Sequence, residues 1–283
     1  MTPMLFAPLP SRALIAVTGE DWRSFLQGQL TQDVETLAIG EARFGALLIP
    51  QGRLLFDMFI IGREDGCWLD VEASLRDALI QRLTMYRLRA KVQFSADPTP
   101  VSALFPAHPD ASRDPSGGSA WAPASAGVSG VWVVDPRLSA LGWRGYGADA
   151  EAEIADETPY DRHRLTLGVP GPADWGSDRT YPIEANFDLL NGIDFKKGCF
   201  VGQETTSRMK RRGHIKNRML PVTFDGQPPP FGTEVLKGEL RAGEILSGQD
   251  GIAMALLRLD RIDGDLTADG RKIRVAKPAY ALS

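Results

Sequence analysis

The order of apolar runs and chain breakers in the first hundred residues constrains the fold more than any other feature of this sequence. A capping box at 18–21 precedes apolar residues at helical spacing, which predicts a helix over 20–37. A second helical pattern over 75–86 is followed by a strand through 90–95. Three apolar segments lie between the two helices, separated by breakers that contain glycine: 42–49, 53–62 and 67–72. This β-β-β-α-β order is typical of an α+β protein with an antiparallel sheet.

The rest of the chain divides into a loop-rich middle and a β-rich end. Prolines and glycines interrupt the sequence between Pro106 and Gly127, so residues 97–130 are expected to form a loop or linker. Beyond residue 218, short β-prone runs cut by Gly, Asp and Pro predict a small closed sheet or barrel. Other ordered elements are expected between these parts: strands near 130–135 and 143–146, and helices near 150–157 and 160–167. The length of 283 residues exceeds a usual single core, which favours two or three domains.

The segment 197–204, Lys-Gly-Cys-Phe-Val-Gly-Gln-Glu, has the composition of a functional site rather than of a core. Its glycines leave the backbone free to adopt positive φ or to approach a ligand closely. Lys196, Lys197 and Arg208 would favour the thiolate of Cys199 if they lie near it, because opposite charge stabilises the reactive form. A glycine-broken turn around a small buried cysteine is the alternative that this segment leaves open.

This segment, with Arg208 and Gly213 after it, resembles the signature of the YgfZ family. These proteins are folate-binding relatives of the glycine-cleavage aminomethyltransferase, and they include mitochondrial iron–sulfur cluster assembly factors. The resemblance implies an α+β cloverleaf: two interleaved ferredoxin-like domains in the folate-binding region 1–217, and a C-terminal β-barrel in 218–283. Weaker matches follow the same order along most of the chain, at 25–34, 52–57, 86–92, 164–170 and 182–188.

The resemblance also implies a cofactor, tetrahydrofolate or a derivative, and a set of site residues. Asp57 lies within an apolar strand, where an anion is costly unless it meets a donor or faces a cavity. It aligns with the aspartate beside the reactive folate nitrogens of the aminomethyltransferases, where a carboxylate could bond the cofactor or move its proton. Glu184 aligns with the glutamate that binds the pterin through two parallel N–H bonds. Within the signature, Cys199 is the expected reactive thiol and Lys197 its tuning group, and further cofactor contacts are expected from Gln203, Glu204 and Arg208.

Charge is unevenly spread along the chain. The net charge is −4, yet residues 196–218 contain eight cationic residues and a single acid, Glu204. The simplest interpretation of this basic run is a solvent-exposed face. The alternative is a binding surface for a nucleic acid or for the poly-glutamate tail of a folate. Because no nucleic-acid-binding motif accompanies the run, tRNA contact is the weaker choice.

Cysteine and histidine usage limits the chemistry further. Cys67 and Cys199 lie far apart in sequence, which argues against a disulfide framework and fits a reducing cytoplasm. Two thiols cannot supply the four thiolates of an iron–sulfur cluster scaffold. The spacing of His108, His163 and His214 matches no metal motif, so no metal site is expected. The sequence has neither an apolar run of roughly 18 residues nor a secretory leader pattern, and no membrane partner is expected.

Two functions compete for these residues. In the first, the chain is a tetrahydrofolate-binding accessory protein that supports assembly or repair of iron–sulfur clusters in client enzymes, including tRNA-modifying enzymes, and Cys199 is essential. In the second, it is a folate-dependent aminomethyl or one-carbon transferase, and Asp57 is essential. The resemblance favours the first, with assembly or client proteins as partners, and whether the chain is an enzyme stays open. A tRNA-binding factor that uses the basic run is a third possibility.

Overall fold

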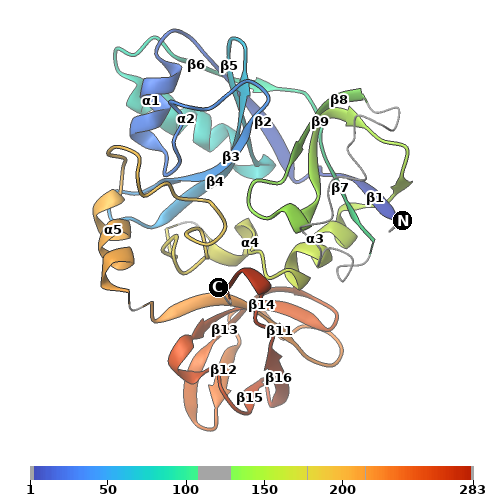
Figure 1. Cartoon of the computed structure of the whole chain (residues 1–283). Coiled ribbons are helices and arrows are strands. Elements are labelled where there is room, and N and C mark those ends of the chain that lie inside the picture. The colour runs from blue at the N-terminus through green and yellow to red at the C-terminus, as the bar shows by residue number, and fades with distance from the viewer. Residues whose placement is uncertain (1–2, 108–128, 177, 214, 282–283) are drawn as a thin grey trace.

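The computed structural model describes residues 3–107, 129–176, 178–213 and 215–281, which form three lobes (Figure 1). The first lobe is built on a five-stranded antiparallel sheet in the order β3-β4-β5-β2-β6. Its elements are β2 (Arg12–Thr18), α1 (Trp22–Gln29), β3 (Ala42–Leu48), β4 (Leu54–Arg63), β5 (Gly66–Glu72), α2 (Arg76–Arg87) and β6 (Gln93–Asp97).

The two faces of this sheet have different neighbours, and the alternation of side chains decides which residue meets which. Leu26 of α1 and Leu83 of α2 pack in one core with Val17 and Ile60 of the strands. Side chains of the opposite face, such as Phe59, belong to a larger core that continues into the rest of the molecule. Because strand residues two apart share a face, Asp57 lies on the same side as Phe59, away from the two helices.

The second lobe is a five-stranded sheet in the order β10-β1-β7-β9-β8. Its strand β1 precedes the first lobe in sequence, whereas the other four strands follow it. The two α+β lobes are therefore interleaved, as expected. The strands are β1 (Met4–Pro8), β7 (Val101–Pro106), β8 (Ser129–Val134), β9 (Trp143–Asp149) and β10 (Glu153–Ile154), and the helices that follow are α3 (Glu157–Thr166), α4 (Pro172–Trp175) and α5 (Gln203–Arg212).

The C-terminal lobe is a closed barrel in which the strand order runs β11-β14-β13-β12-β15-β16 and β16 pairs again with β11. It encloses a core of its own that includes Val222, Ile245 and Leu257. The α+β cloverleaf with a C-terminal barrel, expected from the sequence, is thus confirmed. The strands are β11 (Asn217–Thr223), β12 (Glu234–Lys237), β13 (Leu240–Gln249), β14 (Ile252–Arg258), β15 (Leu266–Ala268) and β16 (Arg271–Val275), and short 3₁₀ turns occur at Ala73–Leu75, Ser139–Leu141, Leu259–Arg261 and Ala279–Ala281.

Three local expectations were wrong in part. The helix expected over 20–37 ends at Gln29, because Leu30 forms a bridge with Leu47 and the chain then leaves the helical path. The expected loop at 97–130 contains strand β7, while residues 108–128 lie outside the described residues. The helix expected near 150–157 is replaced by the short strand β10, which pairs in parallel with β1.

Candidate functional site

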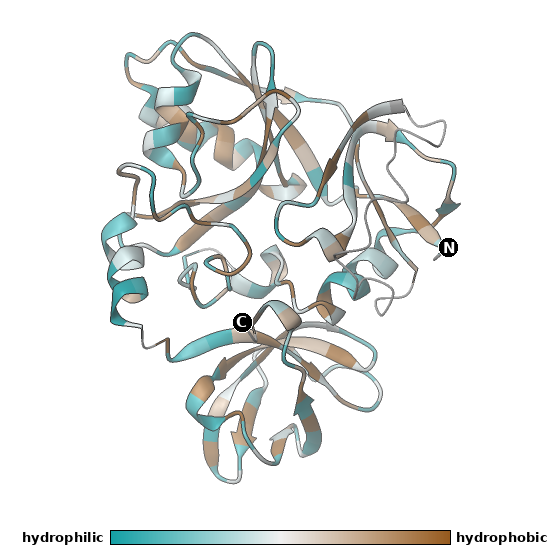
Figure 2. Cartoon of the chain, viewed as in Figure 1, coloured by the Kyte–Doolittle hydropathy of each residue, from teal (hydrophilic) through white to brown (hydrophobic). Residues whose placement is uncertain are grey.

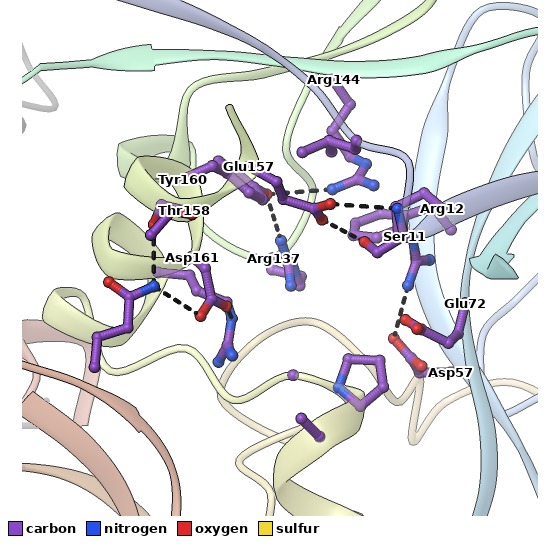
Figure 3. A pocket seen from close by; sticks show the side chains of 17 residues that line it. Ser11, Arg12, Asp57, Glu72, Arg137, Arg144, Glu157, Thr158, Tyr160 and Asp161 are labelled. Atoms are coloured by element: carbon purple, nitrogen blue, oxygen red, sulfur yellow. Dashed lines mark hydrogen bonds and ion pairs between the residues drawn. The ribbon is translucent and has the colours of Figure 1, made fainter. Parts of the chain in front are cut away.

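A cavity of about 350 Å³ lies between the two α+β lobes and the barrel (Figure 3). Strands β4 and β5 supply one wall, helix α3 supplies the wall across from it, and Gln249 of β13 contributes from the barrel. The volume falls within the range of ligand pockets in proteins. Among the described residues, the charged lining includes the bases Arg12, Arg137, Arg144 and Arg164 and the acids Asp57, Glu72, Glu157 and Asp161.

Asp57 faces this cavity from β4 and is only 5% exposed. Its nearest cation is Arg12, whose Nη1 lies 4.0 Å from Asp57 Oδ2, too far for a hydrogen bond. Burial raises the pKa of Asp57, and the charges of Arg12 and Arg137 oppose this shift without cancelling it. A buried carboxyl group with a raised pKa that lines a cavity is a candidate functional residue.

Asp57→Asn is expected to raise the free energy of unfolding at pH 7 by about 1 kcal/mol, because a neutral amide replaces a poorly partnered buried acid. The folded-state pKa of Asp57 lies above the unfolded value of 3.8. Its contribution to stability is therefore fully present below pH 3.8 and is lost as the pH rises through the folded-state pKa. Urea unfolding between pH 4 and 8 should show a flatter profile for the variant, and a lower stability at pH 7 would contradict this account.

Behind Asp57, a fully buried carboxylate, Asp70 of β5, joins the two α+β lobes. Arg12 Nε donates to Asp70 Oδ1 at 2.7 Å, and Arg144 Nη2, from the second lobe, donates to Oδ2 at 2.7 Å. Tyr146 also donates its hydroxyl to Oδ2. Burial alone would raise the pKa of Asp70, but the two guanidinium groups outweigh it and hold the pKa below its usual range. Asp70 is thus a structural anion that fixes the arginines around the cavity.

Tyr160 of α3 occupies the wall across from Asp57 (Figure 3). Its hydroxyl oxygen accepts hydrogen bonds from Arg137 Nη2 at 3.0 Å and from Arg144 Nη1 at 3.2 Å. Arg137 is in turn held by Asp135, through its Nε at 3.0 Å and its Nη2 at 2.8 Å. With two donors on its oxygen, Tyr160 can offer its own O–H to an acceptor inside the cavity.

The signature segment lies elsewhere, beside the C-terminal end of α1. The Lys197 ammonium donates to the backbone carbonyls of Gln27, Leu30 and Gln32 at 2.7, 2.6 and 2.9 Å. Burial lowers the pKa of Lys197 to about 8, against the opposing charges of Asp33, Asp194 and Glu35. The hydrogen bonds of Lys197 thus go to the last turn of α1 and to the backbone just after it, and they anchor the segment that carries Cys199.

Cys199 is exposed and does not belong to the lining of the central cavity in the described part of the chain. Of the two glycines around it, Gly202 adopts a positive φ of 80° at the N-cap of α5, and a Cβ there would lie 2.7 Å from the carbonyl of Ile49. Gly198 has open space around it. The backbone freedom expected of these glycines is needed at Gly202. There the chain adopts a positive φ and passes close to the end of β3 before α5 begins.

Helix α5, which begins four residues after Cys199, consists mainly of hydrophilic residues (Figure 2). Its exposed cations make no ion pair with the described residues: Arg208, Lys210, Arg211 and Arg212. Gln203 and Glu204 line a surface groove of about 500 Å³ together with Phe195 and Lys210. The structure therefore places the expected cofactor contacts Gln203, Glu204 and Arg208 on this outer face, whereas Asp57 lines the central cavity.

Glu184 also lies apart from the described lining of the central cavity. One of its carboxylate oxygens accepts from the backbone N–H of Tyr181 at 3.2 Å, and the other accepts from Asn217 Nδ2 at 3.0 Å.

The sequence analysis did not single out Arg12, Glu72 or Tyr160 as site residues. An acidic residue inside an apolar strand indicates a possible site, and this pattern identified Asp57. The same pattern occurs at Asp70, within the apolar run of β5.

The described residues contain no cluster of three or more His, Cys, Asp or Glu side chains able to hold a metal ion. His108 and His214 lie outside the described residues, and His163 Nε2 is bonded to the carbonyl of Ala140. None of the helices described is long and apolar enough to cross a membrane.

The architecture matches a solved enzyme structure over nearly its whole length. Aminomethyltransferase T of the glycine cleavage system from Bartonella henselae superposes with a TM-score of 0.75, covering 99% of this chain and 86% of that one at 16% sequence identity. The protein therefore has the aminomethyltransferase fold. Residues 216–282 also match the family model of the C-terminal β-barrel domain of CAF17.

Curated relatives narrow this class. The human mitochondrial iron–sulfur cluster assembly factor IBA57 is 31% identical over 299 residues, which cover 95% of this chain and 82% of the human protein. The homologue from Pyricularia oryzae is 32% identical over 314 residues, covering 98% of this chain and 76% of that protein. The chain belongs to the IBA57 family of iron–sulfur cluster assembly factors. The resemblance to the YgfZ family is correct at the level of this fold and this class of assembly factor.

The relatives also correct the expected location. The sequence analysis placed the protein in the cytoplasm, but the human, mouse and fungal relatives are named as mitochondrial proteins, which contradicts that expectation. Two cysteines that form no disulfide with each other do not identify a compartment, so cysteine usage could not support the cytoplasmic expectation.

Proposed function

We propose that this protein supports the assembly or repair of iron–sulfur clusters in client enzymes, tRNA-modifying enzymes among them. In this proposal Cys199 acts on the protein partner or its cluster, while the central cavity binds tetrahydrofolate or a derivative. The observation that carries the proposal is the separation of the two features: the thiol lies on an exposed face, and Asp57 lies inside the cavity. A thiol outside the ligand cavity suits work on another macromolecule.

The cavity has a composition that fits a reduced folate. Phe59, Leu9 and Pro172 supply apolar surface for a flat ring, and Asp57 and Glu72 supply acceptors for its N–H groups. Tyr160 supplies a donor. A substituted tetrahydrofolate would supply a one-carbon unit when bound, and the residues of this chain would hold the ring and exclude water from it. The fold alone does not establish turnover, because one fold can support different activities.

A one-carbon transferase is the second candidate, because Asp57 lines the cavity and has a raised pKa. A transferase needs a group that moves a proton at the reacting nitrogen, and Asp57 could serve. Such an enzyme should lose activity when Asp57 is neutralised and should tolerate the loss of Cys199. The accessory function instead predicts that activity is lost when Cys199 is replaced.

The test measures the activity of an iron–sulfur client enzyme in cells that lack this protein and receive variants of it. Cys199→Ser is expected to restore no client activity, because the hydroxyl is neither a comparable nucleophile nor a soft metal ligand. Asp57→Asn is expected to weaken rescue without abolishing it. Cys67→Ala is the matched control, since that cysteine is buried and burial raises its pKa, so it is chemically inert.

Full rescue by Cys199→Ser, at protein levels equal to wild type, would remove Cys199 from the function. If Asp57→Asn alone failed to rescue, the transferase candidate would be favoured.

Contact with tRNA is tested by measuring tRNA binding at increasing salt concentration. Binding that weakens with salt and is lost when Lys210, Arg211 and Arg212 are neutralised would support the basic face of α5 as a nucleic-acid surface.

A further inference from the structure

Three neighbouring strands place two carboxyl groups and one guanidinium group side by side in the cavity. In the sheet order β4-β5-β2, Arg12 of β2 is directly opposite Glu72 of β5, and Phe59 of β4 is opposite Asp70 of β5. Two residues further along the same antiparallel ladder, Asp57 stands beside Glu72 on the cavity side. Figure 3 shows both carboxyl groups next to each other below Arg12.

The positive charge available to this pair is limited. Arg12 directs Nε and Nη2 to the side chain and carbonyl of Asp70, so only its Nη1 edge is turned toward Asp57. Arg144 is bound to Asp70 and Tyr160 in the same way. Two carboxyl groups thus share one guanidinium edge, with Asp57 buried and Glu72 half-buried, and like charges so placed resist double ionisation.

The other groups that face the pair do not relieve this repulsion. Arg137 is held by Asp135 and contributes only at longer range. Glu157 adds a negative charge, and its carboxylate accepts from the backbone N–H and the hydroxyl of Ser11. Burial raises the pKa of Glu72, and Asp57 and Glu157 raise it further against the charge of Arg12.

We propose that Asp57 and Glu72 share one proton and together bind the amino-pyrimidinone edge of the ligand in the central cavity. This inference rests on the proposed function, in which that ligand is a reduced folate. The edge presents two adjacent N–H donors and a carbonyl acceptor. A carboxylate beside a carboxylic acid presents the complement, acceptors for the two N–H groups and one O–H donor for the carbonyl.

Glu184 is the alternative position for this contact, because sequence similarity aligns it with a pterin-binding glutamate. In this chain both oxygens of Glu184 already accept from Tyr181 and Asn217, and the described cavity lining does not include it. Glu72 has no comparable protein donor among the described residues, and it lines the cavity directly. The structure therefore favours the Asp57–Glu72 pair over Glu184.

The test is a calorimetric titration of tetrahydrofolate into the full-length protein between pH 5.5 and 8.5. Wild-type affinity is expected to fall by about tenfold as the pH rises, about 1.4 kcal/mol, since loss of the shared proton removes the donor and adds repulsion. Glu72→Gln, whose amide always supplies a donor, is expected to bind with an affinity that no longer changes with pH. The double variant Asp57→Asn/Glu72→Gln lacks a carboxylate and should bind at least about tenfold more weakly at every pH.

Two further variants make the result decisive. Glu20→Gln changes an exposed glutamate that pairs with Lys91, and it should reproduce the wild-type pH profile. Glu184→Gln should also retain that profile. Loss of binding in Glu184→Gln, with the pH dependence intact in Glu72→Gln, would overturn the proposal in favour of Glu184.

Absence of binding to wild type at about 1 mM tetrahydrofolate would contradict the proposed function and the ligand part of this inference together. The shared proton has its own readout without ligand. Thermal unfolding of wild type should lose stability as the pH rises through the titration of the pair, and Glu72→Gln should flatten this profile. An unchanged profile in Glu72→Gln would overturn the proton sharing itself.

Discussion

Replacing Asp70 by asparagine is expected to lower the free energy of unfolding by about 3–5 kcal/mol, the cost typical of removing one partner from a buried ion pair. Asp70 is fully buried, and Arg12 and Arg144 both donate to it at 2.7 Å. Asparagine has the same shape but no charge. It therefore leaves two buried guanidinium groups without their main counter-ion.

The loss should also reach the cavity. Arg144 connects Asp70 to Tyr160, and Arg12 directs its remaining edge toward Asp57. Without Asp70 the two arginines are free to turn toward Asp57, which would lower the pKa of Asp57 by bringing positive charge closer. The Asp70→Asn variant is thus expected to lose both stability and the pH dependence of ligand binding.

Urea unfolding at pH 7 and at pH 2.5, which is below the unfolded pKa of 3.8, measures the effect. The folded-state pKa of Asp70 lies below its unfolded value, so its contribution is present at neutral pH and is lost as the pH falls through the folded-state pKa. Wild type should therefore lose more stability on acidification than Asp70→Asn. Asp65→Asn, at an exposed pair with Arg63, is the matched control and should change stability by less than about 0.5 kcal/mol. A similarly small change in Asp70→Asn would show that the network is not structural.

The limits of sequence reasoning are clearest in the segment after α1. Helical spacing correctly marked Leu30, Val34 and Leu37 as apolar positions, and all are buried. The helix nevertheless ends at Gln29, because Thr31 donates its hydroxyl to the carbonyl of Gly192, far along the chain, and accepts from the backbone of Ala46. Periodicity reports burial well, but a contact over such a separation decides the local conformation.

The same distinction applies to the site. Asp57 could be found from sequence because an acid in an apolar strand needs a reason. Its surroundings could not, since Asp70 and Arg144 are 74 residues apart and meet only through the interleaving of two sheets. Cys199 was identified from the composition of segment 197–204 and from the resemblance of that segment to a family signature. Its separation from the cavity became visible only with the fold.

Lys197→Met is expected to lower the free energy of unfolding by about 2–4 kcal/mol and to reduce support of iron–sulfur client enzymes, although Cys199 remains intact. The ammonium satisfies three carbonyls at the end of α1, where the helix macrodipole is negative. Methionine preserves the apolar stem but donates no hydrogen bond. Bonds to a charged donor typically contribute about 1.5–3 kcal/mol each, and solvent can recover part of that loss at this half-buried position.

The matched comparison is Lys196→Met, which removes the same charge from the neighbouring exposed position and should change stability by less than about 0.5 kcal/mol. Lys197→Arg should rescue poorly, because a planar guanidinium cannot direct three donors to carbonyls grouped around one ammonium nitrogen. Denaturant unfolding at pH 7 and client activity in cells measure both consequences. If Lys197→Met were as stable as wild type yet inactive, the lysine would act in the chemistry of Cys199 rather than as the anchor of its loop.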